Sequence, residues 1–288
     1  IDNKKDGGRI VHLPGDGYNI ASDMESIILD SVGWLVPKPK GRIAYDLSHQ
    51  PRLSVDSWDG EFSTLTDPFN HFEELRTLAA NHTYTFDKFY PSSAGNFTAA
   101  RLAKYDVLIL SWPDIDYSSA DRTALMDWVE GGGSLLILGD RTGLIGGGTG
   151  DVYINQLIQD LDMSLGTTDV INYASMTPAT EGHLTLENCA TLYIGYRNYL
   201  VVLGNATEIW MDGTDCVVAG QEYGLGRVIL SADMNIFDST QLNHDSNIQY
   251  ALNALNWLTA ADAEVLVFTD YGYSGTYRDP VALAMNDL

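Results

Sequence analysis

Residues 105–143 read YDVLILSWPDIDYSSADRTALMDWVEGGGSLLILGDRTG. The first nine of them are largely apolar, which is typical of a parallel strand covered on both faces. Ser118 followed by Asp121 is a capping-box pattern and Gly131 is a favourable C-cap, so a helix is expected between them. SLLILGD (134–140) is a second buried strand. This order of strand, helix and strand predicts an α/β sheet with mainly parallel strands.

The chain upstream shows the same alternation. RIAYDLSH (42–49) predicts a strand that ends in polar residues, and TYTFDKF (83–89) predicts another. Between them, residues 69–82 place Phe, Leu and Ala side chains on one face at helical spacing, so we expect a helix there. The upstream part therefore adds two more strands to the parallel sheet.

The chain downstream changes character. Residues 151–166 predict one more helix, and short apolar runs follow it. Asp212–Gly213 is a favourable hairpin turn, which indicates that some of these strands pair antiparallel. Residues 244–258 predict a final amphipathic helix. The expected fold class is α/β: a mainly parallel sheet with flanking helices and an added, partly antiparallel strand region.

Composition narrows the class of protein. The chain has 288 residues, 45% of them hydrophobic, enough for one large domain or two small ones. It carries 39 acidic against 16 basic side chains, a net charge of −23, which repels phosphate backbones, so we expect no nucleic-acid partner. No apolar run is long enough to span a membrane. The scattered acids suit a salty exterior. We expect no cofactor and no dedicated metal site, with loosely bound Ca²⁺ left open.

Cysteines and sequons bear on the location. Cys189 and Cys216 each lie close to an expected strand, and both a single disulfide bridge and two separate buried thiols fit that placement. Asn81, Asn96 and Asn205 stand in Asn-x-Thr sequons and are candidate glycosylation sites. Together with the acidic surface, these sequons favour an extracellular or cell-surface location.

The beginning of the chain resembles its end. Residues 7–36 match residues 224–259: each has a Gly-Arg strand, a polar loop and a helix that closes in Trp-Leu. This match predicts that 1–36 is the tail of one repeat, that 37–260 is a whole domain, and that 261–288 begins the next repeat. The alternative is that βα units commonly look alike. If the repeat is true, the end fragments either pack on the middle copy or pair with a neighbouring molecule. The second option gives head-to-tail assembly, which can continue as a filament.

Three segments carry a family resemblance. YDVLILSWP, GGGSLLILGDRTG and GQEYGLGRVILSADMNIF resemble the class I glutamine amidotransferase-like superfamily, and they look closest to its non-catalytic branch. That branch includes domains of gliding-motility ABC-transport accessory proteins and the amino-terminal domain of an intraflagellar transport protein. The resemblance covers roughly residues 40–260 and implies a flavodoxin-like sheet.

The resemblance does not extend to the catalytic residues. Catalytic members place a cysteine at the centre of a Gly-x-Cys-x-Gly turn, activated by a His–Glu pair near the chain end. Here the turn runs from Gly139 to Gly143 and has Arg141 at its centre, and a guanidinium cannot act as that nucleophile. His244 is followed by Asp245 instead of the expected His-x-Glu pattern. We therefore expect a scaffold without enzyme activity.

Ligands of open α/β sheets bind beyond the carboxyl ends of the strands. The residues expected at that edge are Asp46, Ser48, His49, Trp112, Asp114, Asp140 and Arg141. They predict a binding site for carbohydrate or another small ligand, with Arg141 holding an acidic group. The alternative is an ion pair between Asp140 and Arg141 that only fixes the turn. The glycine-rich run at 143–150 lacks Gly-Lys-Ser/Thr and does not match a P-loop.

Asp46 and His49 leave a further alternative open. Their spacing suits half of an acid–base pair, and equally a capped strand end with a hydrogen-bonded histidine. Three hypotheses follow. The first, which we favour, is a non-enzymatic structural or interaction protein that binds itself head-to-tail or binds other surface proteins. The second is a ligand-binding module, and the third is a hydrolase of unfamiliar mechanism that uses Asp46 or His49.

Overall fold

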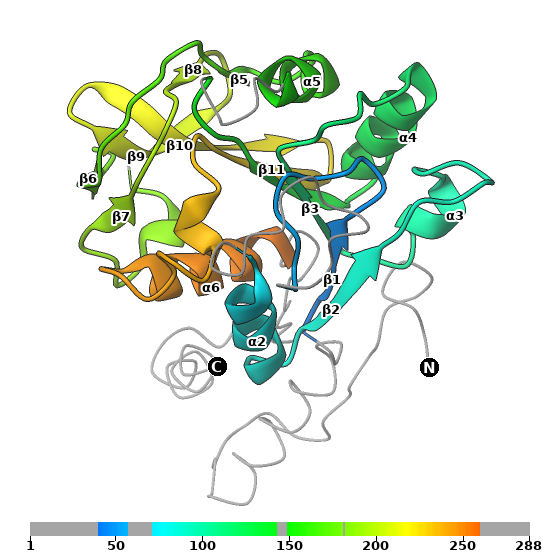
Figure 1. The fold of residues 1–288 in the computed structure, drawn as a ribbon, viewed down its shortest axis with the longest axis horizontal. Coiled ribbons are helices and arrows are strands. Elements are labelled where there is room, and N and C mark those ends of the chain that lie inside the picture. Colours follow the sequence, from blue (N-terminus) through cyan, green and yellow to red (C-terminus); the bar gives the residue numbers. More distant parts are fainter. Residues whose placement is uncertain (1–39, 57–70, 143–148, 181, 260–288) are drawn as a thin grey trace, which may run out of the picture. The chain divides into compact units, whose positions relative to one another are not determined.

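The structure is a computed structural model of the 288-residue chain, and it describes residues 40–56, 71–142, 149–180 and 182–259 (Figure 1). The helices are α2 (Glu73–Asn81), α3 (Ala99–Leu102), α4 (Ser119–Glu130), α5 (Gly150–Leu157) and α6 (Asn247–Thr259), with short 3-10 turns η1 (Leu184–Leu186) and η2 (Asn235–Phe237). The strands are β1 (Arg42–Asp46), β2 (Thr85–Phe89), β3 (Val107–Ser111), β4 (Ser134–Leu138), β5 (Met163–Leu165), β6 (Ala174–Pro178), β7 (Leu192–Ile194), β8 (Leu200–Val202), β9 (Thr207–Asp212), β10 (Asp215–Tyr223) and β11 (Gly226–Ser231). These strands hydrogen-bond into one mixed sheet.

One half of the sheet is parallel. Its strands lie in the order β2-β1-β3-β4-β11, and each neighbouring pair is parallel. This is the strand order of a flavodoxin-like sheet. Leu138 at the end of β4 is level with Ser111 on β3 and with Ser231 on β11. The expected fold class is confirmed, and the segments that follow these three strands leave the sheet at one edge.

Helices cover both faces of the parallel strands. α2 and α6 lie on one face, and α3, α4 and α5 lie on the other (Figure 1). β3 and β4 are buried along their whole length, which explains why both strands are continuously apolar. The helices predicted over 69–82 and 244–258 are α2 and α6, and each begins a few residues later than predicted.

The helix between β3 and β4 begins at a capping box. The Ser118 hydroxyl accepts a hydrogen bond from the Asp121 N–H at 3.1 Å, and the Asp121 carboxylate accepts one from the Ser118 N–H at 3.2 Å. Gly131 follows the last turn as the C-cap. Both ends of α4 therefore lie where the sequence predicts them, because the box satisfies backbone groups that the helix itself leaves unbonded.

The added strands form the antiparallel half of the sheet. β10 pairs antiparallel with β11 and β9, and β6 and β7 continue the sheet beyond β9. The β9–β10 hairpin turns at Gly213, whose φ of 63° is a left-handed conformation that glycine adopts without strain. The expectations of partly antiparallel strands and of this hairpin are confirmed.

The helix predicted over 151–166 is wrong in its second half. α5 ends at Leu157, and the following strand β5 pairs antiparallel with β8. The Asn155 side chain explains the change, because it accepts a hydrogen bond from the Leu165 N–H at 2.8 Å and donates one to the Leu165 carbonyl at 2.9 Å. These two bonds hold β5 beside α5, whereas a continued helix would carry Leu165 away from it.

The outer edge of β7 is closed by the start of α6. The Asn247 side chain accepts a hydrogen bond from the Tyr193 N–H at 2.9 Å and donates one to the Tyr193 carbonyl at 2.8 Å. The Ser246 N–H donates to the Thr191 carbonyl at 3.1 Å. One amide side chain thus takes the place of a neighbouring strand. Another chain cannot extend the sheet here without displacing these bonds.

The described residues cover the middle of the three predicted domains. The segments 1–36 and 261–288 lie outside the described residues, so of the two matching repeat ends only 224–259 is described, as β11 and α6. Residues 41–259 belong to one compact unit with its own hydrophobic core. Among the residues that the structure describes, no helix is long and apolar enough to cross a membrane.

Candidate functional site

Three side chains at the end of β1 and in the loop after it are held together with one carboxylate from α4. His49 Nδ1 lies 2.8 Å from Asp46 Oδ2, and the Ser48 hydroxyl donates to the other Asp46 oxygen at 2.5 Å. On the far side of the ring, His49 Nε2 lies 3.8 Å from Asp121 Oδ2. We name Asp46, Ser48, His49 and Asp121 the β1 cluster. Its imidazole lies between two carboxylates.

The β1 cluster is closed to solvent. His49 is 1% exposed, and the rings of Phe97 and Tyr117 lie 4.8 and 4.3 Å from its ring. Ser48 Oγ contacts Nδ1, the same nitrogen that contacts Asp46, so the histidine does not link a serine to a carboxylate as in a Ser-His-Asp triad. The geometry matches the alternative of a hydrogen-bonded histidine at a capped strand end.

The predicted site residues after β3 make structural contacts. The Trp112 ring is fully buried against α5, so closely that a Cβ on Gly150 would lie 2.6 Å from Trp112 Nε1. Asp114 Oδ1 accepts a hydrogen bond from Arg52 Nε at 2.8 Å. Trp112 is therefore packed in the core, and its place in a ligand site stays a prediction. Asp114 joins the loop after β3 to the loop after β1.

A buried group of carboxylates lies where β4 and β11 end. Asp140 and Asp233 each follow by two residues the paired positions Leu138 and Ser231, so the sheet places them level with one another. Asp238, in the turn after η2, interacts electrostatically with both. All three are at most 1% exposed. We name Asp140, Asp233 and Asp238 the acid cluster.

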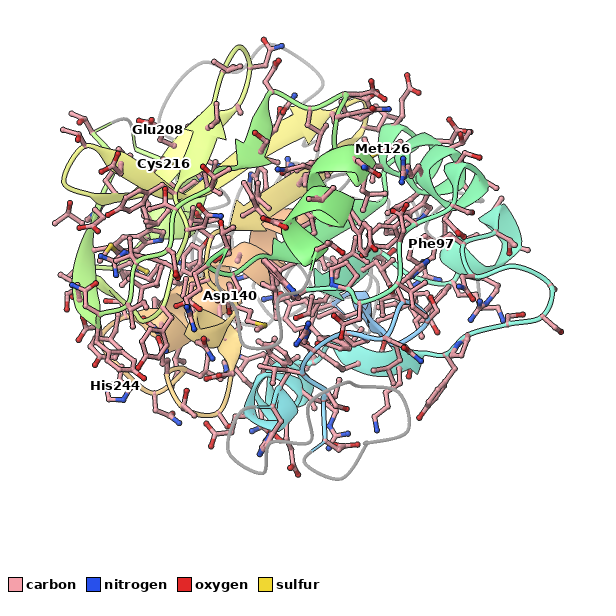
Figure 2. All side chains as sticks on the ribbon, turned by 45° about the horizontal axis from the view of Figure 1, so that its top comes forward. Phe97, Met126, Asp140, Glu208, Cys216 and His244 are labelled. Atoms are coloured by element: carbon pink, nitrogen blue, oxygen red, sulfur yellow. The ribbon has the colours of Figure 1, made fainter. Side chains whose placement is uncertain are left out.

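The members of the acid cluster differ in their hydrogen bonds. The N–H groups of Gly195 and Asn235 donate to the two oxygens of Asp233 at 2.9 and 2.8 Å. Asp140 Oδ1 accepts a hydrogen bond from the Arg141 N–H at 2.7 Å, whereas Asp140 Oδ2 has no partner within the described part of the chain. Figure 2 places Asp140 inside the molecule, away from its outline. These bonds favour an ionised Asp233 and a protonated Asp140.

Burial and mutual repulsion raise the pKa values of the acid cluster. Burial is the main cause, and it raises the pKa of Asp233 to about 7 and the pKa of Asp238 to about 6. Burial and the neighbouring charge of Asp233 hold the pKa of Asp140 well above its usual value. Carboxyl groups in such surroundings do not all ionise at neutral pH. The cluster therefore retains at least one proton there.

The two arginines that act electrostatically on the acid cluster are directed to other partners. Arg141 Nη1 lies 2.8 Å from Asp169 Oδ1. Arg197 is buried and pairs with Asp212. An ion pair therefore does fix the turn after β4, with Asp169 and not Asp140 as the partner of Arg141.

Residues 139–142 do not form a nucleophile elbow. Such an elbow is a strained strand-to-helix turn that exposes its central side chain. Arg141 is not among the described non-glycine residues with positive φ, and α5 begins only at Gly150. At its described residues, the turn after β4 therefore shows no strained backbone at Arg141 and carries no cysteine.

Sequence reasoning overlooks two members of the acid cluster. The signal for Asp233 is present, because β4 runs into LLILGD and β11 runs into VILSAD, and each apolar run closes in an aspartate. Because VILSAD is grouped with the added, partly antiparallel strands, the sequence pattern does not place Asp233 beside Asp140. Asp238 has no comparable signal, since the turn after η2 alone sets its position.

Both cysteines are free thiols. Cys216 is buried in β10, and its thiol donates to the Val218 carbonyl at 3.3 Å. Cys189 Sγ lies 3.9 Å from the Thr185 carbonyl oxygen. Of the two alternatives that the sequence leaves open, the structure shows two separate thiols.

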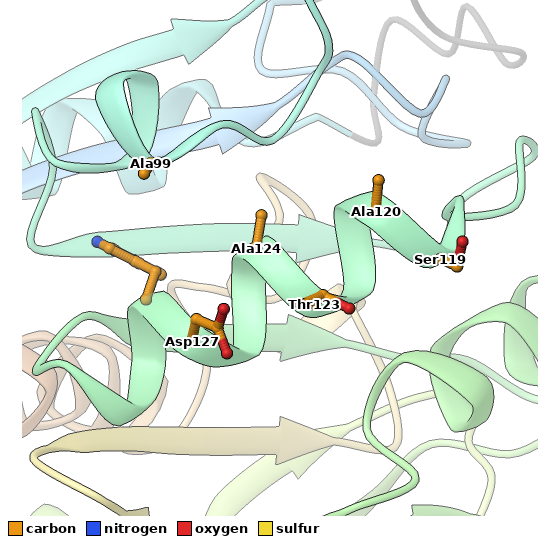
Figure 3. Close-up of a pocket in the computed structure, with 7 residues that line it drawn as sticks. Ala99, Ser119, Ala120, Thr123, Ala124 and Asp127 are labelled. Atoms are coloured by element: carbon orange, nitrogen blue, oxygen red, sulfur yellow. The ribbon is translucent and has the colours of Figure 1, made fainter.

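A shallow groove of about 600 Å³ runs along α4 (Figure 3). Its lining is mostly small side chains: Ala99, Ser119, Ala120, Thr123, Ala124, Asp127 and Trp128. None of the side chains predicted at the sheet edge lines it. Within the described ranges, no group of three or more His, Cys, Asp or Glu side chains is arranged to hold a metal ion.

Comparison with known proteins identifies the fold. No protein-family model matches the sequence, and no curated protein matches it significantly. The mmIFT52 N-terminal domain is similar with a TM-score of 0.60 and 14% identity, over 77% of this chain and 100% of that one. Cytoplasmic protein STM3548 from Salmonella typhimurium has a TM-score of 0.56 and 16% identity, over 76% and 98% of the two chains. A ThuA-like protein from Bacteroides uniformis has a TM-score of 0.50 and 10% identity, over 75% and 90%. Identities this low show a shared fold, so the chain has the α/β fold of these three proteins.

Proposed function

We propose that this chain is a non-catalytic domain of the class I glutamine amidotransferase-like superfamily and that it works by binding proteins. The observation that carries the proposal is Arg141, which occupies the nucleophile position and is ion-paired with Asp169. The fold shared with the mmIFT52 N-terminal domain and the ThuA-like protein supports the superfamily. A domain that keeps this scaffold without its nucleophile acts through its surfaces.

The cysteines support the same proposal. A catalytic cysteine needs a lowered pKa, so that the reactive thiolate forms near neutral pH. Burial raises the pKa of Cys216 to about 12, and the charge of Glu208 adds to the increase. Burial also raises the pKa of Cys189. Figure 2 shows Cys216 and Glu208 together in the antiparallel half, away from Asp140 in the turn after β4, so the Cys216 thiol does not replace the missing nucleophile.

The β1 cluster offers little support for a hydrolase. General acid–base catalysis needs a histidine or carboxylate within reach of a substrate proton. Asp46 and His49 are 3% and 1% exposed, and two aromatic rings cover the histidine. A substrate reaches these groups only after the loops that carry Phe97 and Tyr117 have moved.

The proposal is tested by measuring turnover with the intact chain. We expect no product above the uncatalysed rate from glutamine or from a panel of ester and glycoside substrates. The same assays are run on Asp140→Asn and His49→Ala chains. Turnover that the wild type shows and that either variant loses would identify an enzyme and end the proposal.

Self-association belongs to the same proposal. We expect head-to-tail contacts through residues outside the described ranges, since Asn247 closes the edge of β7. Light scattering over a concentration series compares residues 1–288 with a trimmed 37–262 chain, which keeps the compact unit and its core. Oligomers formed only by the longer chain support the proposal. Monomers of both chains at every concentration contradict it.

An extracytoplasmic location is also proposed. It is supported by the net charge of −23 and by the sequons, since the side chains of Asn81 and Asn205 are exposed and that of Asn96 is half-buried. Mass spectrometry of the chain from its native source tests this. Glycans on Asn81 or Asn205 support the location, whereas recovery of the protein from the cytoplasmic fraction alone contradicts it.

One observation favours a second candidate, a small-ligand-binding module. Asp140 Oδ2 is buried without a hydrogen-bond partner in the described part of the chain, and shifted pKa values gather at functional sites. A sugar or polyol hydroxyl would supply the missing donor. Thermal unfolding with a panel of mono- and disaccharides tests this. A rise in Tm that disappears in an Asp140→Ala chain supports the candidate, and no rise with any sugar removes it.

A further inference from the structure

Four aromatic side chains form a row on the antiparallel half of the molecule. The ring centroids are 5.3 Å apart from Tyr196 to Tyr173, 5.7 Å from Tyr173 to Tyr193, and 4.6 Å from Tyr193 to His244. Tyr173 and Tyr193 are stacked with an angle of 7° between their planes. Figure 2 shows His244 at the outline of the molecule. We name these four rings the tyrosine strip.

The fold beneath the tyrosine strip holds it in place. Both backbone groups of Tyr193 are bonded by the Asn247 side chain. The Gly195 N–H donates to Asp233, and the Tyr173 ring packs so closely over Gly195 that a Cβ there would lie 2.9 Å from Tyr173 Cε1. Rings that are already ordered lose little conformational entropy when a partner binds. The strip is therefore a preorganised surface.

The tyrosine strip is open to solvent. Tyr173 is 51% exposed and Ile171, two residues before it, is 61% exposed. His244 is exposed, and Tyr193 and Tyr196 are half-buried. Tyr193 stacks on one face of the Tyr173 ring, and about half of the Tyr173 residue is still exposed to solvent. Exposed, ordered tyrosines are enriched at the centres of protein interfaces, so the strip has the chemistry of a docking surface.

The region that carries the strip is strongly acidic. Residues 149–180 and 182–259 contain twelve Asp and Glu residues against two arginines and no lysine. Arg197 is paired with Asp212, and Arg227 lies 3.4 Å from Glu222. Neither arginine therefore offsets the remaining acids. Arg141, from the turn after β4, lies 5.6 Å from the centroid of the Tyr196 ring at one end of the strip, and it is paired with Asp169. This surface attracts a positively charged partner and repels an acidic one.

Asp245 places an acidic side chain at the end of the strip, next to His244. Its Oδ2 accepts hydrogen bonds from the hydroxyls of Ser175 and Thr191 at 2.7 and 3.1 Å. Both donors are neutral, and the described residues include no cation paired with this carboxylate. An exposed aromatic row that ends in such a carboxylate combines the two groups that recognise an arginine or lysine side chain.

We propose that the tyrosine strip docks a segment of a partner protein that carries lysine or arginine. One cation of the segment lies against the exposed part of the Tyr173 ring, and a second pairs with Asp245. An apolar side chain between them packs on Ile171. The inference rests on the proposed function, because it names the class of partner that the non-catalytic domain binds.

The test uses the intact chain and two synthetic peptides. Calorimetric titration measures the Kd of acetyl-Arg-Gly-Arg-Gly-Arg-amide, with the Glu-Gly-Glu-Gly-Glu peptide as the charge control. We expect the arginine peptide to bind and the glutamate peptide not to bind. Replacing Tyr173→Ala should weaken binding by roughly two- to thirtyfold, the range that a cation–π contact supplies. Tyr173→Phe keeps the ring and should stay within about twofold of the wild type.

Two further variants sharpen the test. Tyr90→Ala removes an exposed tyrosine from the parallel half, where Tyr90 follows β2, and should leave the Kd unchanged. Asp245→Asn keeps an acceptor for both hydroxyls and removes the charge. It should weaken binding a few-fold at about 0.05 M salt and less at about 0.3 M, because salt screens an exposed charge.

Three results overturn the inference: no binding of the arginine peptide to folded wild-type chain, equal binding to wild type and Tyr173→Ala, or equal binding of both peptides. None of them involves turnover, so the non-catalytic assignment survives a failure of the docking surface. Turnover in the enzyme assays removes that assignment whichever peptide binds.

Discussion

The β1 cluster and the acid cluster lie at the same edge of one sheet, and both bury carboxylates, but their charges are arranged in opposite ways. In the β1 cluster, His49 lies between Asp46 and Asp121. In the acid cluster, Asp140 and Asp233 follow adjacent strands, and the nearby arginines are paired with other acids. One cluster thus contains its own basic group, and the other holds only acids.

The pKa of Asp121 in the β1 cluster moves in the opposite direction from the pKa values of the acid cluster. Burial acts to raise the pKa of Asp121, but hydrogen bonds from Ser118 and the Phe97 N–H and the charge of His49 lower it overall. Burial raises the pKa of Asp233 to about 7, and the charge of Arg197 lowers it too little to reverse this. The β1 cluster therefore links β1 to α4 and stabilises the fold. The acid cluster costs stability at neutral pH, which is more typical of a functional site than of a structural one.

Breaking the β1 cluster should have the largest effect. His49→Ala leaves Asp46 buried without its histidine, and we expect a loss of about 3 kcal/mol in the free energy of unfolding, as for other buried pairs that lose one partner. Urea unfolding followed by tryptophan fluorescence measures it. Asp46→Asn combined with His49→Ala should recover part of the loss, because the buried charge is then gone.

His82→Ala is the matched control for that loss. His82 is exposed at the end of α2 and should cost less than about 0.5 kcal/mol when removed. An equal, small loss in the two single variants would show that the Asp46–His49 pair adds no net stability, and the contrast between the clusters would then not rest on charge.

The acid cluster should make the chain less stable as the pH rises. The folded-state pKa values of Asp233 and Asp238, about 7 and about 6, lie above the values of an unfolded chain. The folded state therefore binds more protons than the unfolded state. The stabilisation that Asp233 and Asp238 contribute is fully present below about pH 4, and it is lost as the pH rises through 6 and 7. We expect the urea midpoint of unfolding to be lower at pH 8 than at pH 5. The corresponding loss in the free energy of unfolding is on the order of 2 kcal/mol.

Asp140→Asn should flatten this pH dependence. The amide imitates a protonated carboxyl group, keeps an acceptor for the Arg141 N–H, and cannot ionise beside Asp233 as the pH rises. We expect the variant to gain about 1 kcal/mol at pH 8 and little at pH 5. Asp160→Asn removes one charge from an exposed residue and controls for the net charge of −23. A gain of the same size in both variants would assign the effect to overall repulsion.

The parallel half of the fold could be predicted from sequence because its signals are local. A strand buried on both faces needs a continuous apolar run, and the box of Ser118 and Asp121 fixes where α4 begins. The end of α5 could not be predicted, because Asn155 bonds to Leu165, ten positions away in sequence and in another element. The apolar residues after Leu157 fit a helix and a strand equally well.

The candidate site also has a part that follows from local sequence patterns and a part that depends on long-range contacts. The sequence places Asp46, Asp140 and Arg141 at the carboxyl edge, because strand ends can be read from apolar runs. It does not reveal that Arg141 pairs with Asp169, since that partner comes from a loop of the antiparallel half. Such long-range pairings decide which carboxylates are left without a paired cation. The acid cluster can therefore be recognised only from the folded structure.

The smallest expected effect concerns Arg141 itself. Its ion pair with Asp169 is partly exposed, so Arg141→Ala should cost at most about 1 kcal/mol. The charge of Arg141 also lowers the pKa of Asp140, so its removal strengthens repulsion within the acid cluster and should cost more at pH 8 than at pH 5. Arg122→Ala breaks a comparable ion pair with Asp116 and should cost the same at both pH values. Urea midpoints of the two variants at both pH values measure the difference. If the cost of Arg141→Ala does not change with pH, Arg141 acts on Asp169 alone, and the acid cluster is electrostatically independent of the turn after β4.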